Sequence, residues 1–134
     1  MKMLGVDPTV DFAFRKLFGD PRNSDILIDL LNSVLQPVVP ITSVEVLNPF
    51  LDKAYADDKL SILDIKARDE AGRWINVEMQ TTISSALRNR LVYYTSALYS
   101  SQLLEGESYA TLTPAICICF LSRVTTLPRN QLKN

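Results

Sequence analysis

The chain has 134 residues, of which 47% are hydrophobic and 22% charged, and its formal net charge is −1. This size and composition exclude a disordered protein and predict one globular domain over residues 1–134 with its own hydrophobic core. The chain contains no histidine, which excludes catalytic triads, metal sites and general bases that depend on imidazole. A net charge near zero gives no overall attraction to nucleic acid, so any such binding requires a local basic patch.

The cysteines and the N-terminus indicate the compartment. Cys117 and Cys119 lie two residues apart in the apolar run Ala115–Leu121. A strand gives such a pair no bridging geometry, so we expect buried thiols in a reducing, cytoplasmic environment. The N-terminal residues lack the apolar run of a signal peptide. The longest apolar run is far shorter than a membrane span, and we expect no membrane association.

The first part of the chain predicts two helices and a strand. Thr9–Phe18 has apolar residues at helical spacing. A second helix follows, with an apolar stripe that consists of Leu27, Leu30, Leu31, Val34 and Leu35. Ile41–Phe50 is rich in residues that favour strands and predicts the first strand of a sheet.

The stretch Lys59–Gln80 predicts two further strands joined by a tight turn. The runs Leu60–Arg68 and Arg73–Gln80 flank Asp69-Glu70-Ala71-Gly72, in which Gly72 suits a positive φ. Counted outward from this turn, the register places Asp64 opposite Glu78, with their Cβ atoms roughly 5 Å apart. Two carboxylates at that distance repel each other unless a divalent cation binds both.

A different interpretation of these strands needs no metal. Side chains alternate along a strand, so Lys66 and Arg68 share the face of Asp64, while Glu78 shares its face with Trp74, Asn76 and Gln80. The face that carries Asp64 is then exposed to solvent, and Glu78 forms an ion pair with Lys66 or Arg68 across the strands.

The second half predicts a helix and a final strand. The helix covers roughly Ser85–Leu104, with Leu87, Leu91, Tyr94 and Leu98 at helical spacing and Gly106 just past its end. We expect Tyr93, Tyr94 and Tyr99 to be packing residues. Ala115–Leu121 predicts a fully buried strand, parallel to a neighbour because a helix precedes it. The order of elements predicts an α/β fold, a central mixed sheet flanked by helices.

Several segments in this order resemble one nuclease superfamily. They are FAFRKLF, LDIKA, NVEMQ and RNRLVYYTSALYSSQLLEGESYATLTPAICICF. With Asp64 followed by Glu78-Met79-Gln80, the chain resembles PD-(D/E)xK nucleases, and among them the recombination-promoting nuclease and transposase-like family. Gln80 stands where the usual lysine would be, and E-x-Q is the common form in that branch. The resemblance covers about Asp7–Leu121 and implies a restriction-endonuclease-like αβββαβ core.

The resemblance also implies a chemistry, that of a metal-dependent DNA endonuclease. Asp64, Glu78 and a backbone carbonyl near Met79 would hold Mg²⁺ or Mn²⁺. Gln80 would hold a water or a phosphate oxygen, and Lys66 would replace the positive charge of the family lysine. Nucleases of this superfamily often take a further carboxylate from the first helix, for which Asp11 and Asp29 are candidates.

Arg88 and Arg90 are the candidates for contacts with DNA phosphates, because they open the helix that follows Gln80. The polar tail, residues 122–134, adds Arg123, Arg129 and Lys133. Relatives usually continue beyond the last core strand, so the chain fits a truncated copy as well. The alternative function is an inactivated or truncated nuclease-like domain that binds DNA or self-associates, for example as a homodimer. A third is a small α/β module that binds Ca²⁺ structurally.

Overall fold

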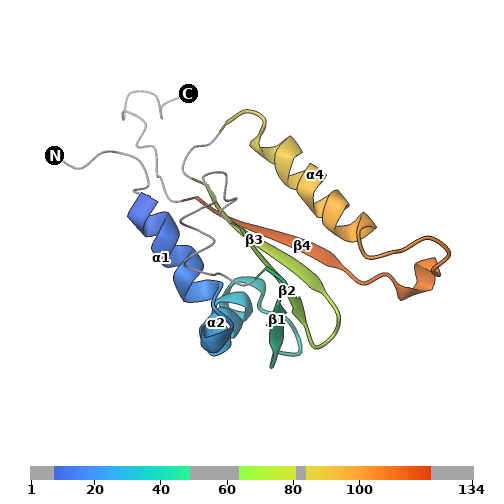
Figure 1. Ribbon diagram of the computed structural model, residues 1–134, viewed down its shortest axis with the longest axis horizontal. Coiled ribbons are helices and arrows are strands. Elements are labelled where there is room, and N and C mark those ends of the chain that lie inside the picture. The colour runs from blue at the N-terminus through green and yellow to red at the C-terminus, as the bar shows by residue number, and fades with distance from the viewer. Residues whose placement is uncertain (1–7, 49–63, 81–83, 122–134) are drawn as a thin grey trace.

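A computed structural model of the chain describes residues 8–48, 64–80 and 84–121 (Figure 1). A four-stranded sheet lies at its centre, with helices on both faces. The elements in chain order are α1 (Pro8–Phe18), the 3₁₀ turn η1 (Pro21–Asn23), α2 (Ser24–Leu35), β1 (Val44–Val46), β2 (Asp64–Asp69), β3 (Trp74–Gln80), α4 (Leu87–Ser100), the 3₁₀ turn η2 (Tyr109–Thr111) and β4 (Ala115–Leu121). None of the described helices is long and apolar enough to cross a membrane.

The sheet is mixed, as predicted. Its strand order is β1-β2-β3-β4, in which β1–β2 and β2–β3 are antiparallel and β3–β4 is parallel. The parallel pair follows from α4, which returns the chain to the end of the sheet where β3 began. Helices, three strands, a helix and a last strand are the order of the αβββαβ core.

One face of the sheet carries the hydrophobic core. The helices α1 and α2 cover this face (Figure 1), and Leu27 and Leu31 of α2 are fully buried there. Burial of one such leucine stabilises the fold by about 2 kcal/mol. The other buried apolar residues of this cluster are Phe14, Ile41, Val46, Ile65, Ala67, Ile75, Val77 and Ile118. The apolar residues Ile65 and Ala67 of β2 and Ile75, Val77 and Met79 of β3 alternate with polar ones, so one face of these strands is apolar.

The opposite face of the sheet is polar and is covered by α4 alone among the described helices (Figure 1). Because Leu98 is the buried residue of α4, this helix shields β3 and β4 only in part. In β4 only Ile118 is buried, and Cys117 and Cys119 are half-buried thiols that form no disulfide. The predictions of a fully buried last strand and of buried thiols are therefore wrong.

The turn between β2 and β3 has the predicted form, with Gly72 at φ +80°. The carboxylate of Asp69 organises this turn. It accepts hydrogen bonds from the backbone amides of Ala71 at 3.0 Å and Arg73 at 2.9 Å, and from Arg73 Nε at 2.6 Å. These contacts fix the register of the whole hairpin, because they begin at its first residue pair.

Two elements are shorter than predicted, for identifiable reasons. The side chain of Asn32 binds both backbone groups of Ile41, with Ile41 N–H donating at 2.8 Å and its carbonyl accepting at 2.9 Å, so β1 begins only at Val44. After Ser100, Gln102 exchanges hydrogen bonds with the backbone of Thr113 at 2.9 Å. The chain thus turns toward β4 at the end of α4, well before Gly106.

Candidate active site

The two candidate carboxylate residues lie on paired strands. In the ladder between β2 and β3, Asp64 pairs with Glu78, as the sequence predicts. Directly opposed residues lie on the same face of a sheet, here the face beneath α4. Glu78 is only 1% exposed. Of Asp64 the structure describes the backbone, and its side chain lies outside the described part.

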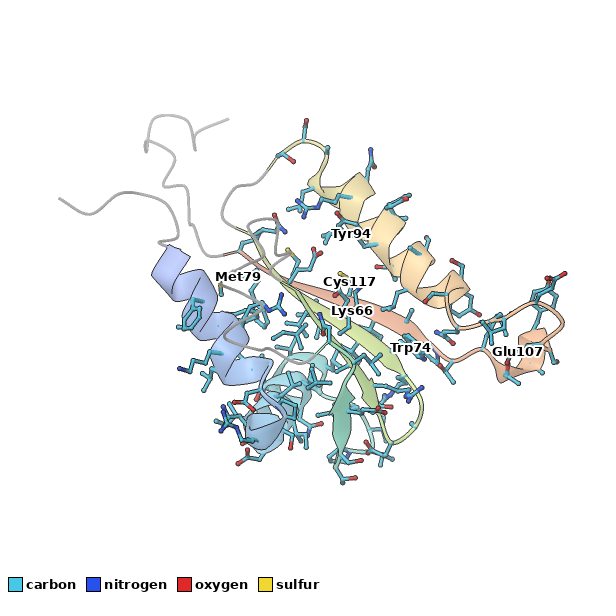
Figure 2. All side chains as sticks on the ribbon, in the orientation of Figure 1. Lys66, Trp74, Met79, Tyr94, Glu107 and Cys117 are labelled. Carbon is cyan, nitrogen blue, oxygen red and sulfur yellow. The ribbon has the colours of Figure 1, made fainter. Side chains whose placement is uncertain are left out.

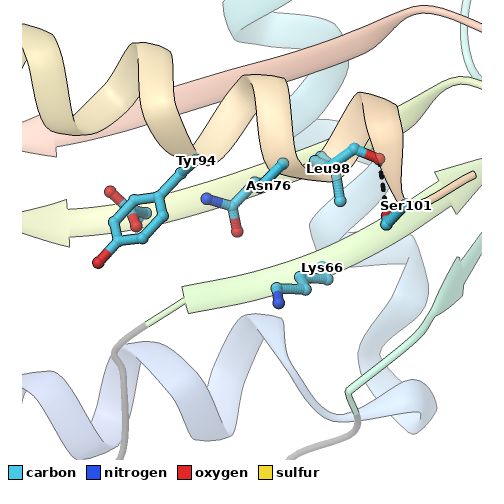
Figure 3. A pocket seen from close by; sticks show the side chains of 7 residues that line it. Lys66, Asn76, Tyr94, Leu98 and Ser101 are labelled. Carbon is cyan, nitrogen blue, oxygen red and sulfur yellow. Dashed lines mark hydrogen bonds between the residues drawn. The ribbon is translucent and has the colours of Figure 1, made fainter.

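A cavity of about 270 Å³ lies between this face and α4 (Figure 3). Its lining residues are Lys66, Asn76, Glu78, Tyr94, Ala97, Leu98 and Ser101. Lys66 pairs with Asn76 in the ladder, is exposed, and lines the same cavity as Glu78. Figure 2 places the labelled Lys66, Tyr94 and Cys117 on the α4 side of the sheet and Met79 toward α1.

Arg90 connects α4 to the end of β3. Its Nη1 donates to Gln80 Oε1 at 3.4 Å, and its guanidinium group lies over the ring of Tyr94 at 5.3 Å. Arg88 is exposed on the same turn of α4. Of the two predicted phosphate contacts, the described structure thus brings Arg90 to the end of the strand that carries Glu78 and Gln80.

Cys119 adds a thiol beside Glu78. The two residues pair in the parallel ladder between β3 and β4. Burial raises the pKa of the Cys119 thiol, and the neighbouring negative charge of Glu78 raises it further, against a smaller opposite effect of Arg90. Cys119 therefore stays protonated at neutral pH and is a poor nucleophile there.

The donor atoms on this face suit a hard divalent cation. Among the side chains that the structure describes, no three or more histidine, cysteine or acidic residues gather around one point. The ladder nevertheless pairs Glu78 with Asp64, and Gln80 adds an amide oxygen two residues on. Carboxylate and amide oxygens are the ligands of Mg²⁺ and Mn²⁺, and a buried carboxylate such as Glu78 favours a cation beside it.

Other predicted site residues lie elsewhere or outside the described part. Asp29 is exposed on α2, across the sheet from Glu78, so the structure does not bring it to the site. The side chain of Asp11 lies outside the described part, as do the tail residues Arg123, Arg129 and Lys133. The side chain of Met79 packs against the core, so only its backbone can belong to the site.

The structure excludes one of the two ion pairs that the metal-free interpretation gave to Glu78, the pair with Arg68. Arg68 donates to Glu45 of β1 at 2.8 Å and lies over the ring of Trp74 at 5.7 Å. An ion pair between Arg68 and Glu78 is therefore wrong, because the guanidinium group faces the other edge of the sheet.

The tyrosines of α4 divide into two groups. Tyr93 is 70% exposed and packs edge-on against the ring of Tyr94, with 5.9 Å between the ring centroids, and Tyr99 is also exposed, so neither belongs to the hydrophobic core. Tyr94 is half-buried and lines the cavity. Asn76 was not predicted to have a role, although its place on the face of Glu78, two residues away, was a signal for one.

The family of the chain follows from a sequence comparison. The family model of the PD-(D/E)XK nuclease family transposases matches residues 8–134. The chain belongs to this family. The predicted resemblance is thereby confirmed, and the mixed sheet flanked by helices is the α/β, restriction-endonuclease-like fold expected for a PD-(D/E)XK nuclease family transposase. Comparison with curated proteins found no significant match, and comparison with solved structures found none either.

Proposed function

We propose that this PD-(D/E)XK family protein is a metal-dependent endonuclease that hydrolyses phosphodiester bonds in DNA. The observation that supports it most is the pairing of Asp64 with the buried Glu78 on one sheet face. Two positively charged residues border the same face, Lys66 at the cavity and Arg90 at the end of β3. Carboxylates flanked by cationic groups suit a phosphate ester that is cleaved with a divalent cation.

In this proposal each residue has a separate task. Asp64, Glu78 and the carbonyl of Met79 hold Mg²⁺ or Mn²⁺. When bound, the cation supplies a water of lowered pKa and neutralises charge on the scissile phosphate, so no histidine is needed. Gln80 carries no charge, and its amide orients a water or a phosphate oxygen while Arg90 holds it in place.

Lys66 takes the place of the family lysine in this proposal. Lys66→Ala should lower the nicking rate by about 10²-fold, because one donor to the developing phosphate charge is lost. The fold should be unchanged, since Lys66 is exposed. Lys16→Ala, at an exposed lysine on α1, is the matched control. Equal rates for Lys66→Ala and the wild type would mean that Gln80 and the cation suffice.

The salt dependence of DNA binding tests Arg88 and Arg90. A site that neutralises about four phosphates gives a slope near −3.6 when log K is plotted against log salt concentration. Replacing both arginines by alanine should flatten this slope by about 1.8, whatever the DNA sequence. Arg22→Ala, at an exposed arginine between α1 and α2, should leave it unchanged. A double variant with the wild-type affinity and slope would place the phosphate contacts elsewhere, with the basic tail as the next candidate.

A plasmid-nicking assay tests the proposed function itself. Purified protein should convert supercoiled DNA to nicked DNA with Mg²⁺ or Mn²⁺ and leave it intact in chelator. The presence of Gln80 in place of the lysine favours one alternative, a non-catalytic domain that binds DNA or self-associates. Binding without nicking would establish that alternative. The homodimer stays a prediction, which light scattering of the purified chain would check.

A further inference from the structure

The cavity beneath α4 contains a buried acceptor that is not satisfied. Asn76 is 4% exposed, and its Oδ1 accepts no hydrogen bond within the described part of the chain. Its Nδ2 donates to the sulfur of Cys117, a weak acceptor, at 3.7 Å. Buried polar atoms are nearly always satisfied, so an acceptor in this position calls for a donor from outside the chain, which a water or a ligand in the cavity can bring.

The walls of the cavity are mostly apolar. The polar exceptions are the amide of Asn76, the hydroxyl of Ser101, and the charged residues Lys66 and Glu78. Tyr94, Ala97 and Leu98 of α4 form one side (Figure 3). The hydroxyl of Ser101 is already used, since it donates to the carbonyl of Leu98 at 2.8 Å. The volume of about 270 Å³ is below that of pockets for drug-sized ligands, and it suits a single small ring system with one edge donor.

We propose that this cavity takes a nucleobase that rotates out of the DNA stack beside the scissile phosphate. The inference rests on the proposed nuclease function, because Glu78 lines the same cavity and a phosphate held there brings its own base within reach. Enzymes that extrude a base hold it between aromatic and apolar side chains and bind its hydrogen-bonding edge. Here Tyr94 and Leu98 contact the ring, and Asn76 Oδ1 accepts from the exocyclic amino group of adenine or cytosine.

Three short duplexes of equal length test this proposal by fluorescence anisotropy, with Ca²⁺ in place of Mg²⁺. One is fully paired, one has a central A·C mismatch, and one has two opposed abasic sites at that position, one in each strand. A mismatched base unpairs more easily, so the wild type should bind the A·C duplex about tenfold more tightly than the paired one. The abasic duplex is as easily deformed but offers no base, so its affinity should stay near that of the paired duplex.

Two matched variants test whether the preference for the A·C duplex depends on the cavity. Ala97→Phe puts a ring into the cavity from an exposed position and should abolish the preference for A·C. Ser96→Phe adds the same ring to the next residue, which does not line the cavity, and should keep the preference. Circular dichroism of both variants checks the fold. Equal tight binding of abasic and A·C duplexes would show a preference for deformable DNA and overturn the proposal.

The nucleobase can also come from a free nucleoside, and competition distinguishes the two sources. Millimolar deoxyadenosine should not remove the A·C preference, since a base tethered to bound DNA has the higher effective concentration. Deoxyadenosine binding in a wild type that shows no A·C preference would overturn the assignment to DNA. Nicking in Mg²⁺ without any A·C preference would refute this inference and leave the nuclease intact. Absence of both nicking and DNA binding would refute both.

Discussion

Asp64→Asn and Glu78→Gln should each reduce metal-dependent nicking by at least about 10³-fold, because each removes one of the two carboxylates that hold the cation. The two residues pair directly in the ladder between β2 and β3, and each amide keeps the size and shape of the carboxylate it replaces, so we expect both variants to fold. Nicking of supercoiled plasmid under single-turnover conditions measures the effect. The exposed Asp25 of α2 provides the control, since Asp25→Asn should keep the wild-type rate.

Thermal unfolding in chelator separates this role from a structural one. Without a cation, Glu78 is a buried carboxylate opposite a second acidic residue, and both desolvation and repulsion oppose its charge. Neutralising either residue should therefore leave the melting temperature in chelator unchanged or raise it. A marked drop for both variants in chelator would assign the pair to folding rather than to catalysis.

Asp69→Ala should lower the free energy of unfolding by about 3 kcal/mol, the loss expected when one partner of a buried charge pair is removed. The carboxylate of Asp69 is fully buried and accepts two backbone amides of the turn besides Arg73 Nε. The variant leaves these donors without their acceptor, although Arg73 is partly exposed and regains some hydration. Urea denaturation monitored by circular dichroism measures the change.

Two further variants show whether the loss in free energy of unfolding comes from the turn network. Glu45→Ala removes an ion pair between the exposed Glu45 and the partly exposed Arg68, and should cost less than about 1 kcal/mol. Asp69→Asn keeps the shape of the side chain and should fall between Asp69→Ala and the wild type. If Asp69→Ala were no less stable than Glu45→Ala, the turn network would not determine the stability of the hairpin.

The hairpin was predictable because its determinants are local. Gly72 allows the turn, and alternation then sets which residues oppose each other, so the pairing of Asp64 with Glu78 follows from sequence positions alone. The residue at which β1 begins was not predictable in this way. It depends on Asn32, nine residues earlier, whose side chain takes both backbone groups of Ile41.

The candidate site was predictable only along its strands. Periodicity and the turn put Lys66 and Glu78 on the same face, and the ladder between β2 and β3 confirms that placement. The cavity depends instead on where α4 crosses this face, and the spacing of residues along the sequence does not predict that position. For the same reason the sequence assigned no function to Asn76, and the different environments of Tyr93 and Tyr94 emerged only with the position of the helix.

Direct titration with Mn²⁺ tests the central claim, that Asp64 and Glu78 together bind a divalent cation. Electron paramagnetic resonance of free Mn²⁺ reports binding without any need for DNA or activity. The wild-type chain should bind Mn²⁺ in competition with Mg²⁺, and Asp64→Asn and Glu78→Gln should each lose that binding while Asp25→Asn retains it. Undiminished Mn²⁺ affinity in both site variants would contradict the claim that this pair of residues is the metal site.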